Sequence, residues 1–266
     1  MRRVSRAIPA VLTVLLTACS GAATPRPVSP APSPSASPTS SPASSPTAIP
    51  TPAPEPHKAF AHATGMVAVP NDRYLSMWNH PGPGEADYLF DAHNPNPSGG
   101  PRSPLLIDGR QRVGGERWIR VLLPVRPNGA SDWAKAGDVT VRPVFQRIVV
   151  DLSERVLRHY VRDRLVSRFR VGIGAPQYPT GQGTFYVWQR VSFADASGPY
   201  GIFALGLSGF SPVLSDWPGE GRMAIHGTAD PSDRGREVSH GCIRVYNDDL
   251  RALTDVPLGT PVVIRP

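Results

Sequence analysis

The stretch Ser239-His240-Gly241-Cys242-Ile243-Arg244 sets one cysteine apart in a chain of 266 residues. The other cysteine, Cys19, lies in an N-terminal segment with the features of a targeting signal, so the mature folded part would hold a single thiol. A cysteine attacks as its thiolate, and a neighbouring imidazole is the usual means of forming that thiolate near neutral pH. His240 lies two positions before Cys242, and His226 lies sixteen positions before it. An isolated cysteine is more often a small buried apolar residue, but this context favours a nucleophile.

The N-terminus has the pattern of an exported lipoprotein. Three arginines precede a short apolar run at residues 8–16, which is about half the length of a membrane-spanning helix. The following Leu16-Thr17-Ala18-Cys19 resembles the bacterial lipobox, in which cleavage leaves a lipidated N-terminal cysteine. We therefore expect a signal peptide at residues 1–18 and palmitate-type acylation of Cys19. The protein would lie at the outer face of the cytoplasmic membrane, in the cell wall, held by its lipid anchor.

Residues 19–56 are predicted to form a disordered stalk behind the lipidated cysteine. Twelve prolines lie between Ser20 and Pro56, and Ser, Thr and Ala fill the gaps, so little apolar surface is available for folding.

Removing residues 1–18 lowers the formal net charge from +7 to +4, which suits a polyanionic surface such as a cell wall. No dense Lys/Arg stripe with interleaved aromatic residues occurs, so no nucleic-acid partner is expected.

Residues 57–143 are predicted to form a small all-β module. Turn-rich segments such as Pro81-Gly82-Pro83-Gly84 alternate with strand candidates at 117–123 and 138–141. The run from Trp118 to Pro124, followed by Asp132-Trp133, resembles a bacterial SH3-like module. The segment carries no constellation of catalytic residue types. We expect it to place the protein without taking part in the chemistry.

Residues 144–266 are predicted to form a second, mainly β domain. Strand candidates lie at 147–152, 156–161, 165–171, 184–188, 223–226 and 261–265, with a turn at Asp163-Arg164. Asn247 is a plausible N-cap for one short helix at 248–254, with acidic residues in its first turn.

The motifs of this second domain are similar to the signature of the L,D-transpeptidase (YkuD-type) catalytic domain family. Ile225-His226-Gly227-Thr228 and the stretch 239–245 carry the resemblance, together with Val171-Gly172-Ile173-Gly174 and Pro179-Thr180-Gly181 upstream. The family has a second proline where this chain has Gly181. The resemblance covers about residues 145–266 and implies a mainly β protein. Its catalytic domain would be mixed and β-sandwich-like with one short helix, preceded by the small SH3-like module.

The resemblance also implies an activity and its catalytic pair. A cysteine transpeptidase of this kind joins peptidoglycan stem peptides by 3→3 cross-links through an acyl-enzyme, with a tetrapeptide donor and a side-chain amine as acceptor. Cys242 matches the family's nucleophile and His226 its base. Carbapenem-type β-lactams are the expected covalent inhibitors, and no cofactor or metal is expected.

The remaining motif residues receive supporting roles from the same resemblance. Gly227 would orient the imidazole through its carbonyl, and amides around His240, Gly241 and Cys242 would form an oxyanion hole. Ser239 and Arg244 are assigned to substrate binding. For Arg244 a structural ion pair is the alternative, and for His240 the alternatives are a substrate-facing residue or a second base.

Three other functions remain open at this stage. Water could replace the acceptor amine, which would make the protein an L,D-carboxypeptidase. His226, His240 and Cys242 could bind zinc, although their spacing is not a recurring zinc-ligand spacing. A non-enzymatic wall-binding lipoprotein is the third alternative, which the intact motif disfavours.

The lipobox-like sequence predicts that Cys19 carries the anchor. Metabolic labelling with a clickable palmitate analogue should tag the wild-type protein and leave Cys19→Ala unlabelled. Equal labelling of the two proteins would exclude Cys19 as the anchor.

Overall fold

The computed structural model describes residues 63–94, 102–216 and 219–266. The predicted signal peptide, Cys19 and the proline-rich stalk lie outside these residues. The described residues all belong to one compact unit. Within the described ranges, no helix is long and apolar enough to cross a membrane.

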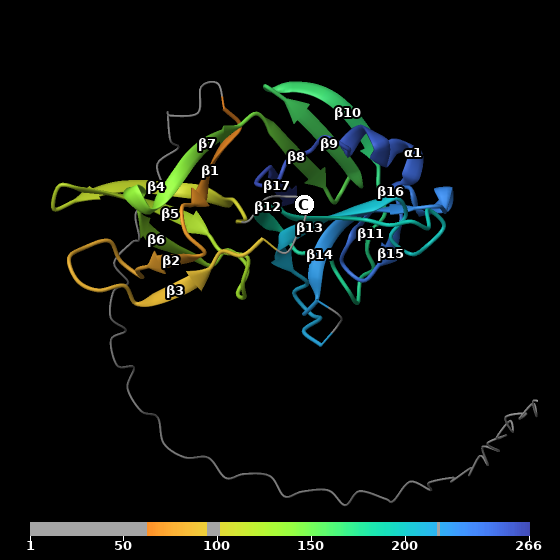
Figure 1. Ribbon diagram of the computed structural model, residues 1–266. Helices are drawn as coiled ribbons and strands as arrows, with labels where there is room; N and C mark the ends of the chain where they lie inside the picture. Colours follow the sequence, from red (N-terminus) through yellow and green to blue (C-terminus); the bar gives the residue numbers. More distant parts are fainter. Residues whose placement is uncertain (1–62, 95–101, 217–218) are drawn as a thin grey trace, which may run out of the picture. The chain divides into compact units, whose positions relative to one another are not determined.

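The first half of this unit consists of short strands separated by turns rich in glycine and proline, as the sequence predicts. Its strands are β1 (Gly65–Pro70), β2 (Tyr74–Met77), β3 (Tyr88–Asp91), β4 (Leu105–Val113), β5 (Glu116–Leu122), β6 (Ser131–Lys135) and β7 (Val139–Val144), with a 3-10 helix at Ala136–Asp138. Five of them form a sheet in the order β6-β5-β4-β1-β7, and β2 pairs with β3 (Figure 1). The SH3-like character of this module stays a prediction.

The second half is built on one large mixed sheet. Its strands are β8 (Gln146–Asp151), β9 (Val156–Val161), β10 (Arg164–Arg170), β11 (Ile173–Gly174), β12 (Gly183–Ser192), β13 (Phe203–Phe210), β14 (Arg222–Thr228), β15 (Glu237–Ser239), β16 (Ile243–Tyr246) and β17 (Pro261–Arg265). The eight-stranded sheet has the order β10-β9-β8-β17-β12-β13-β14-β16, and β11 pairs with β15. The β17–β8 and β14–β16 pairs are parallel, and the other pairs of this sheet are antiparallel. The predicted mainly β fold class is confirmed.

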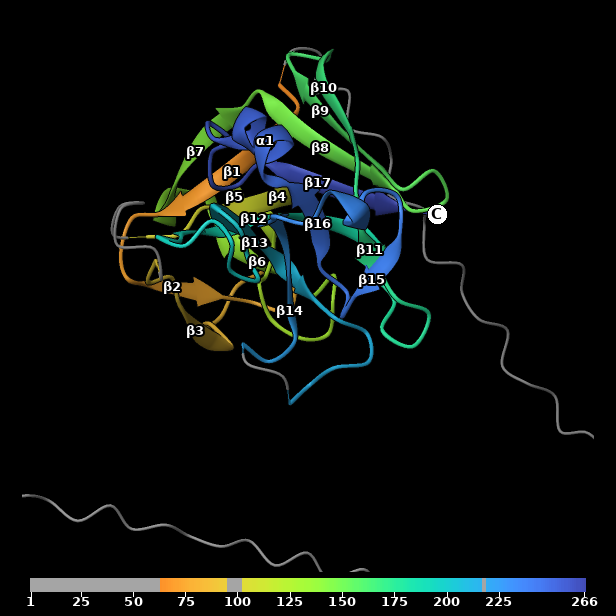
Figure 2. The ribbon, with the colours of Figure 1, turned by 90° about the vertical axis from the view of Figure 1, so that its right-hand side faces the viewer.

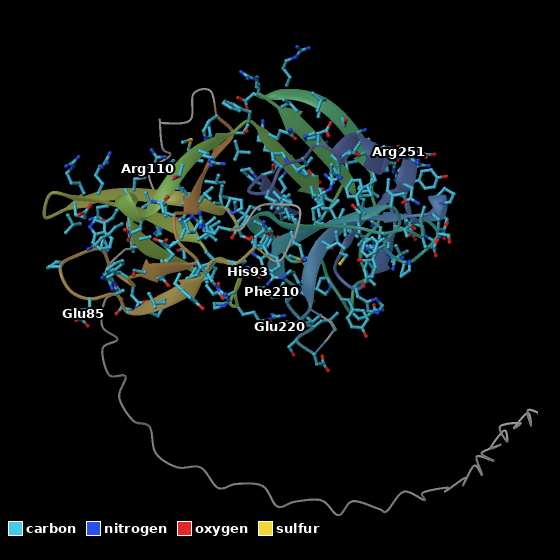
Figure 3. All side chains as sticks on the ribbon, in the orientation of Figure 1. Glu85, His93, Arg110, Phe210, Glu220 and Arg251 are labelled. Atoms are coloured by element: carbon cyan, nitrogen blue, oxygen red, sulfur yellow. The ribbon has the colours of Figure 1, made fainter. Side chains whose placement is uncertain are left out.

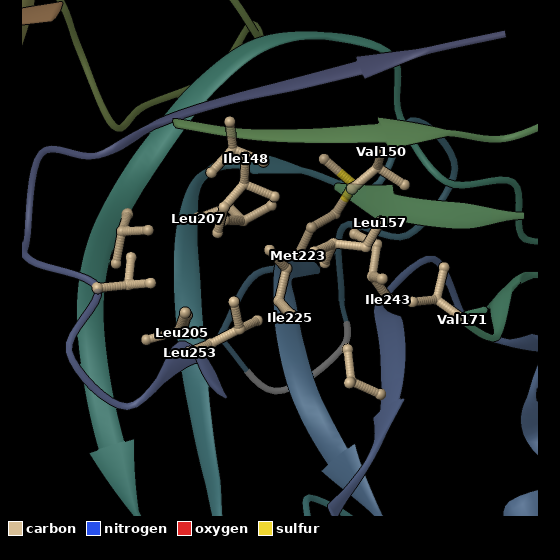
Figure 4. Packing of buried hydrophobic residues seen from close by; sticks show 14 of the residues in the cluster. Ile148, Val150, Leu157, Val171, Leu205, Leu207, Met223, Ile225, Ile243 and Leu253 are labelled. Carbon is tan, nitrogen blue, oxygen red and sulfur yellow. The ribbon is translucent and has the colours of Figure 1, made fainter. Parts of the chain in front are cut away.

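The large sheet folds back over a single apolar core. Ile148 and Val150 of β8 face Leu207 of β13 and Ile225 of β14 across this core, and all four side chains are buried (Figure 4). Residues alternate between the two faces of a strand, so the polar positions of β14 and β16 lie on the opposite face. That face carries the candidate site.

The helix and one turn differ from the sequence-based prediction. Helix α1 (Asn247–Leu250) begins at Asn247 itself and continues as a 3-10 helix at Arg251–Leu253. A separate 3-10 helix at Pro231–Asp233 lies earlier in the chain, in the loop before β15. The N-cap is Tyr246, so the prediction that Asn247 caps the helix is wrong. The Asn247 side chain instead bonds to a loop 45 positions away in the sequence.

The turn between β9 and β10 lies one position earlier than predicted. Val161 pairs with Arg164, so the turn residues are Arg162 and Asp163, with φ values of 48° and 64°. Two positive φ values in a two-residue hairpin loop match the right-handed twist of the flanking strands. Arg164 is consequently the first residue of β10.

Tyr186 of β12 belongs to the core of the N-terminal module. Its side chain is fully buried among residues of that module, including Leu122, and its hydroxyl donates to the Leu122 carbonyl at 3.3 Å. Burial raises the pKa of the Tyr186 phenol. The large sheet therefore supplies part of the apolar core of the module before it.

This shared core predicts that the two halves of the unit stabilise one another. Tyr186→Ala should lower the free energy of unfolding by about 3–5 kcal/mol, because it leaves a cavity and an unpaired carbonyl. The exposed Tyr74 provides the matched control, and Tyr74→Ala should cost less than about 1 kcal/mol. Urea unfolding followed by fluorescence measures both. Equal losses in the two variants would contradict the shared core.

Candidate active site

The parallel pairing of β14 with β16 places His226 and Cys242 on one face. Ile225 pairs with Ile243 and His226 with Arg244. Ile225 and Ile243 point into the core, so His226 and Arg244 point away from it. Cys242 lies two positions before Arg244, and its thiol forms a hydrogen bond with the backbone of Ala224, two positions before His226. His226 of β14 and Cys242, which directly precedes β16, therefore lie on the same face.

A short parallel pair, β11 with β15, fixes the segment that leads to Cys242 (Figure 2). The Ala175 amide donates to the Ser239 carbonyl at 2.9 Å. The Ser239 hydroxyl donates to the Cys242 carbonyl at 2.6 Å and accepts from the Gly241 amide at 3.1 Å. Ser239 is buried, and its hydroxyl closes the turn around the cysteine. Its assigned contact with substrate stays a prediction.

Gly241 is required by the backbone conformation of this turn. Its φ is 113°, in the region that side chains disfavour, although a Cβ there would find ordinary contact distances. The Gly241 amide is engaged by the Ser239 hydroxyl, and the oxyanion hole that the resemblance implies stays a prediction.

The imidazole of His226 is held in one orientation. It is 4% exposed, and its Nδ1 lies 2.8 Å from the Gly227 carbonyl oxygen, to which it donates. This hydrogen bond assigns the proton to Nδ1 and leaves Nε2 as the acceptor. Burial lowers the pKa of His226 to about 4, against the opposite influence of the Gly227 carbonyl. The side chain is therefore a neutral base near pH 7.

Gly227 is required by the close approach of a loop. A Cβ at Gly227 would lie 2.9 Å from the Gly201 Cα and would overlap the side-chain oxygen of Asn247. Asn247 holds this loop through hydrogen bonds from the Ile202 amide and to the Ala196 carbonyl, at 3.2 and 2.8 Å.

Tyr200, in the same loop, packs edge-on against the His226 ring with centroids 5.2 Å apart. Sequence reasoning singled out neither Tyr200 nor the true role of Asn247. Their contacts join segments that no local pattern connects.

The thiol of Cys242 is half-buried. Burial raises its pKa, while the Ala224 hydrogen bond and the positive charge of Arg244 act in the opposite direction. These directions favour a protonated thiol on Cys242 and a neutral imidazole on His226 near pH 7. Such a pair needs proton transfer to the imidazole as the sulfur attacks.

Arg244 is engaged in an ion pair. Its guanidinium lies 3.4 Å from the buried carboxylate of Asp233, which also accepts from the Thr228 hydroxyl at 2.8 Å. The Arg244 side chain remains 30% exposed. The geometry thus contains the structural ion pair that the sequence left as an alternative, and it leaves part of the guanidinium accessible.

His240 lies on the outer side of the cysteine turn. It is exposed, and its ring lies 4.6 Å from that of Tyr178, measured between centroids. The position fits the substrate-facing alternative better than a second base. Among the described residues, no three His, Cys, Asp or Glu side chains gather as a possible metal site.

A groove of about 470 Å³ lies over β12, β13 and β14. It is lined by Gly206 and Ala224, and by Gly219 and Glu220 from the segment that precedes β14. Ala224 is the residue whose backbone contacts the Cys242 thiol. The groove therefore reaches a residue that contacts Cys242, although Cys242 and His226 do not themselves line it.

Comparison with known proteins agrees with this geometry. The family model of the L,D-transpeptidase catalytic domain (YkuD) matches residues 146–264. A Bacillus licheniformis protein named as the L,D-transpeptidase YkuD is 39% identical over 155 residues, which cover 55% of this chain and 86% of the relative. The chain belongs to the L,D-transpeptidase family.

Two further proteins are similar to this chain over a smaller share of its length or at a lower sequence identity. The Bacillus subtilis protein of the same name is 31% identical over 44% of this chain and 65% of its own length. L,D-transpeptidase 3 from Mycobacterium tuberculosis, solved in complex with a faropenem-derived adduct, is 12% identical with a TM-score of 0.40. That match covers 60% of this chain and 98% of the solved one.

The low pKa of His226 predicts the pH dependence of thiol reactivity. Above about pH 5 His226 is neutral and can accept the thiol proton, so iodoacetamide alkylation of Cys242 should vary little with pH up to about 8. The rate should fall as the pH decreases through about 4, where His226 becomes protonated. Mass spectrometry of a Cys19→Ala chain measures the rate.

The matched control is His226→Ala in the same background. Without the base, alkylation should require free thiolate and should increase about tenfold per pH unit. A wild-type profile with its midpoint near 6.5, the ordinary pKa of histidine, would contradict the burial argument.

Proposed function

We propose that the protein is a cysteine-dependent L,D-transpeptidase that forms 3→3 cross-links between peptidoglycan stem peptides. The observation that supports this most directly is the buried, Nδ1-oriented His226 on the same sheet face as Cys242. Membership of the family supports the reaction class. We further propose that the chain acts at the outer face of the cytoplasmic membrane, anchored through Cys19.

The first half-reaction transfers the donor stem to the enzyme. The Cys242 sulfur attacks the carbonyl carbon before the terminal D-alanine, and the thiol proton passes to Nε2 of His226. A carbon–sulfur bond forms, and backbone amides of the cysteine turn stabilise the oxyanion, each contributing about 3 kcal/mol. The carbon–nitrogen bond then breaks, and D-alanine leaves with the proton from His226.

The second half-reaction regenerates the enzyme. The acceptor amine attacks the thioester carbonyl and gives a proton to the neutral imidazole of His226. The carbon–sulfur bond breaks, and the sulfur regains its proton. If water attacks instead, the product is a hydrolysed stem, which is the carboxypeptidase alternative. The Gly227 carbonyl keeps Nε2 available in both half-reactions.

Acylation by a carbapenem tests the catalytic pair. The wild-type protein should gain one covalent adduct per chain, and Cys242→Ser should gain none, because a hydroxyl is a far poorer nucleophile. His226→Ala should react at least about a hundredfold more slowly. Intact-protein mass spectrometry measures all three. An adduct on Cys242→Ser would refute Cys242 as the nucleophile.

Two further arms separate the competing functions. A disaccharide-tetrapeptide substrate should yield cross-linked dimers together with released D-alanine. Hydrolysed stems alone would identify a carboxypeptidase. Treatment with EDTA should leave acylation unchanged, whereas inactivation by the chelator would support the zinc alternative.

A further inference from the structure

The segments between β13 and β14 are held by a residue of the N-terminal module. Arg126 donates to three backbone carbonyls of these segments, those of Ser211 at 3.2 Å, Leu214 at 2.6 Å and Glu220 at 2.7 Å. The guanidinium thereby joins residues 211–216 to residues 219–221. An arginine can do this because its planar group carries five N–H donors in a fixed arrangement.

A second module residue fixes the start of the same connection. The side-chain oxygen of Asn128 accepts from the Phe210 amide, and its nitrogen donates to the Phe210 carbonyl, both at 2.8 Å. The Arg126 guanidinium also lies 4.7 Å from the Phe210 ring centroid. Phe210 is 1% exposed and pairs with Arg222 at the start of β14.

The residues held in this way adjoin the candidate active site. Glu220 and Gly219 line a groove that also includes Ala224, whose backbone contacts the Cys242 thiol. At the other end, Ser211 lies next to the cysteine turn, since a Cβ at Gly241 would be 3.7 Å from the Ser211 hydroxyl. Arg126 therefore holds segments that reach both this groove and the turn that carries Cys242.

We infer that Arg126 and Asn128 are positioning residues for substrate binding. They act by holding residues 211–216 and 219–221 as a wall of the groove that receives the stem peptide. The inference rests on the proposed function for the identity of the substrate. It keeps the expectation that residues 57–143 take no part in the chemistry and adds a role in substrate binding through Arg126 and Asn128.

Steady-state kinetics of the full-length protein with the disaccharide-tetrapeptide donor test this role. Arg126→Ala should raise KM about tenfold and change kcat less than about twofold, because the wall is lost while Cys242 and His226 stay in place. Arg126→Lys keeps the charge but cannot reach three carbonyls, so it should restore less than half of the lost affinity. Arg110→Ala, which removes an exposed arginine of β4 in the same module, is the control and should leave KM unchanged (Figure 3).

Hydrogen–deuterium exchange supplies a readout that does not depend on activity. Peptides covering residues 208–222 should exchange faster in Arg126→Ala than in the wild-type protein, while peptides of β8 and β17 should be unchanged. Equal exchange in both proteins, or an unchanged KM, would overturn the inference. If the wild-type protein neither cross-links stem peptides nor reacts with a carbapenem, the proposed function fails, and exchange alone then decides whether Arg126 holds these segments.

Discussion

The parallel pairing of β14 with β16 is the constraint on which the candidate site depends. Its register puts the core-facing residues Ile225 and Ile243 opposite each other, which forces His226 and the thiol of Cys242 onto the other face. A register shift of one residue in β14 would turn His226 toward the core and Ile225 toward the opposite face. The same apolar contacts that stabilise the fold thus also fix the geometry of the reacting groups.

Electrostatics at the site follow from that placement. Burial keeps both the imidazole and the thiol in their neutral forms, and the Gly227 carbonyl selects which nitrogen carries the proton. A resting thiolate–imidazolium pair would need charges to be desolvated before any substrate is bound. In this arrangement charge appears only while the sulfur attacks, when the oxyanion and its amide donors are also present.

The sequence alone predicted the parts of the fold and site that depend on local pattern. Strand alternation indicated β8, β9 and β17 to within a residue, and the motif residues Cys242 and His226 lie together on one face. Strand β13 was not predicted, because Gly206 and Gly209 interrupt its apolar pattern. The side-chain contacts of Asn247 and Arg126 span 45 and 85 positions, so no local pattern could reveal them. Asn247 was assigned as a cap because its neighbours fit a helix start, whereas its side chain is committed to the loop over Gly227.

Because Tyr186 of β12 packs into the core of the N-terminal module, the domain boundary in the sequence does not coincide with the boundary between the two cores in space. The family match begins at residue 146, yet a phenol from β12 fills the interior of the preceding module and donates to its Leu122 carbonyl. Such a module cannot be exchanged freely for another during evolution. A replacement would have to offer a cavity of the same size and a carbonyl at the same place. Recombination between relatives would therefore favour crossovers that keep β5 and β12 from the same parent, although about sixty positions separate these strands in the chain.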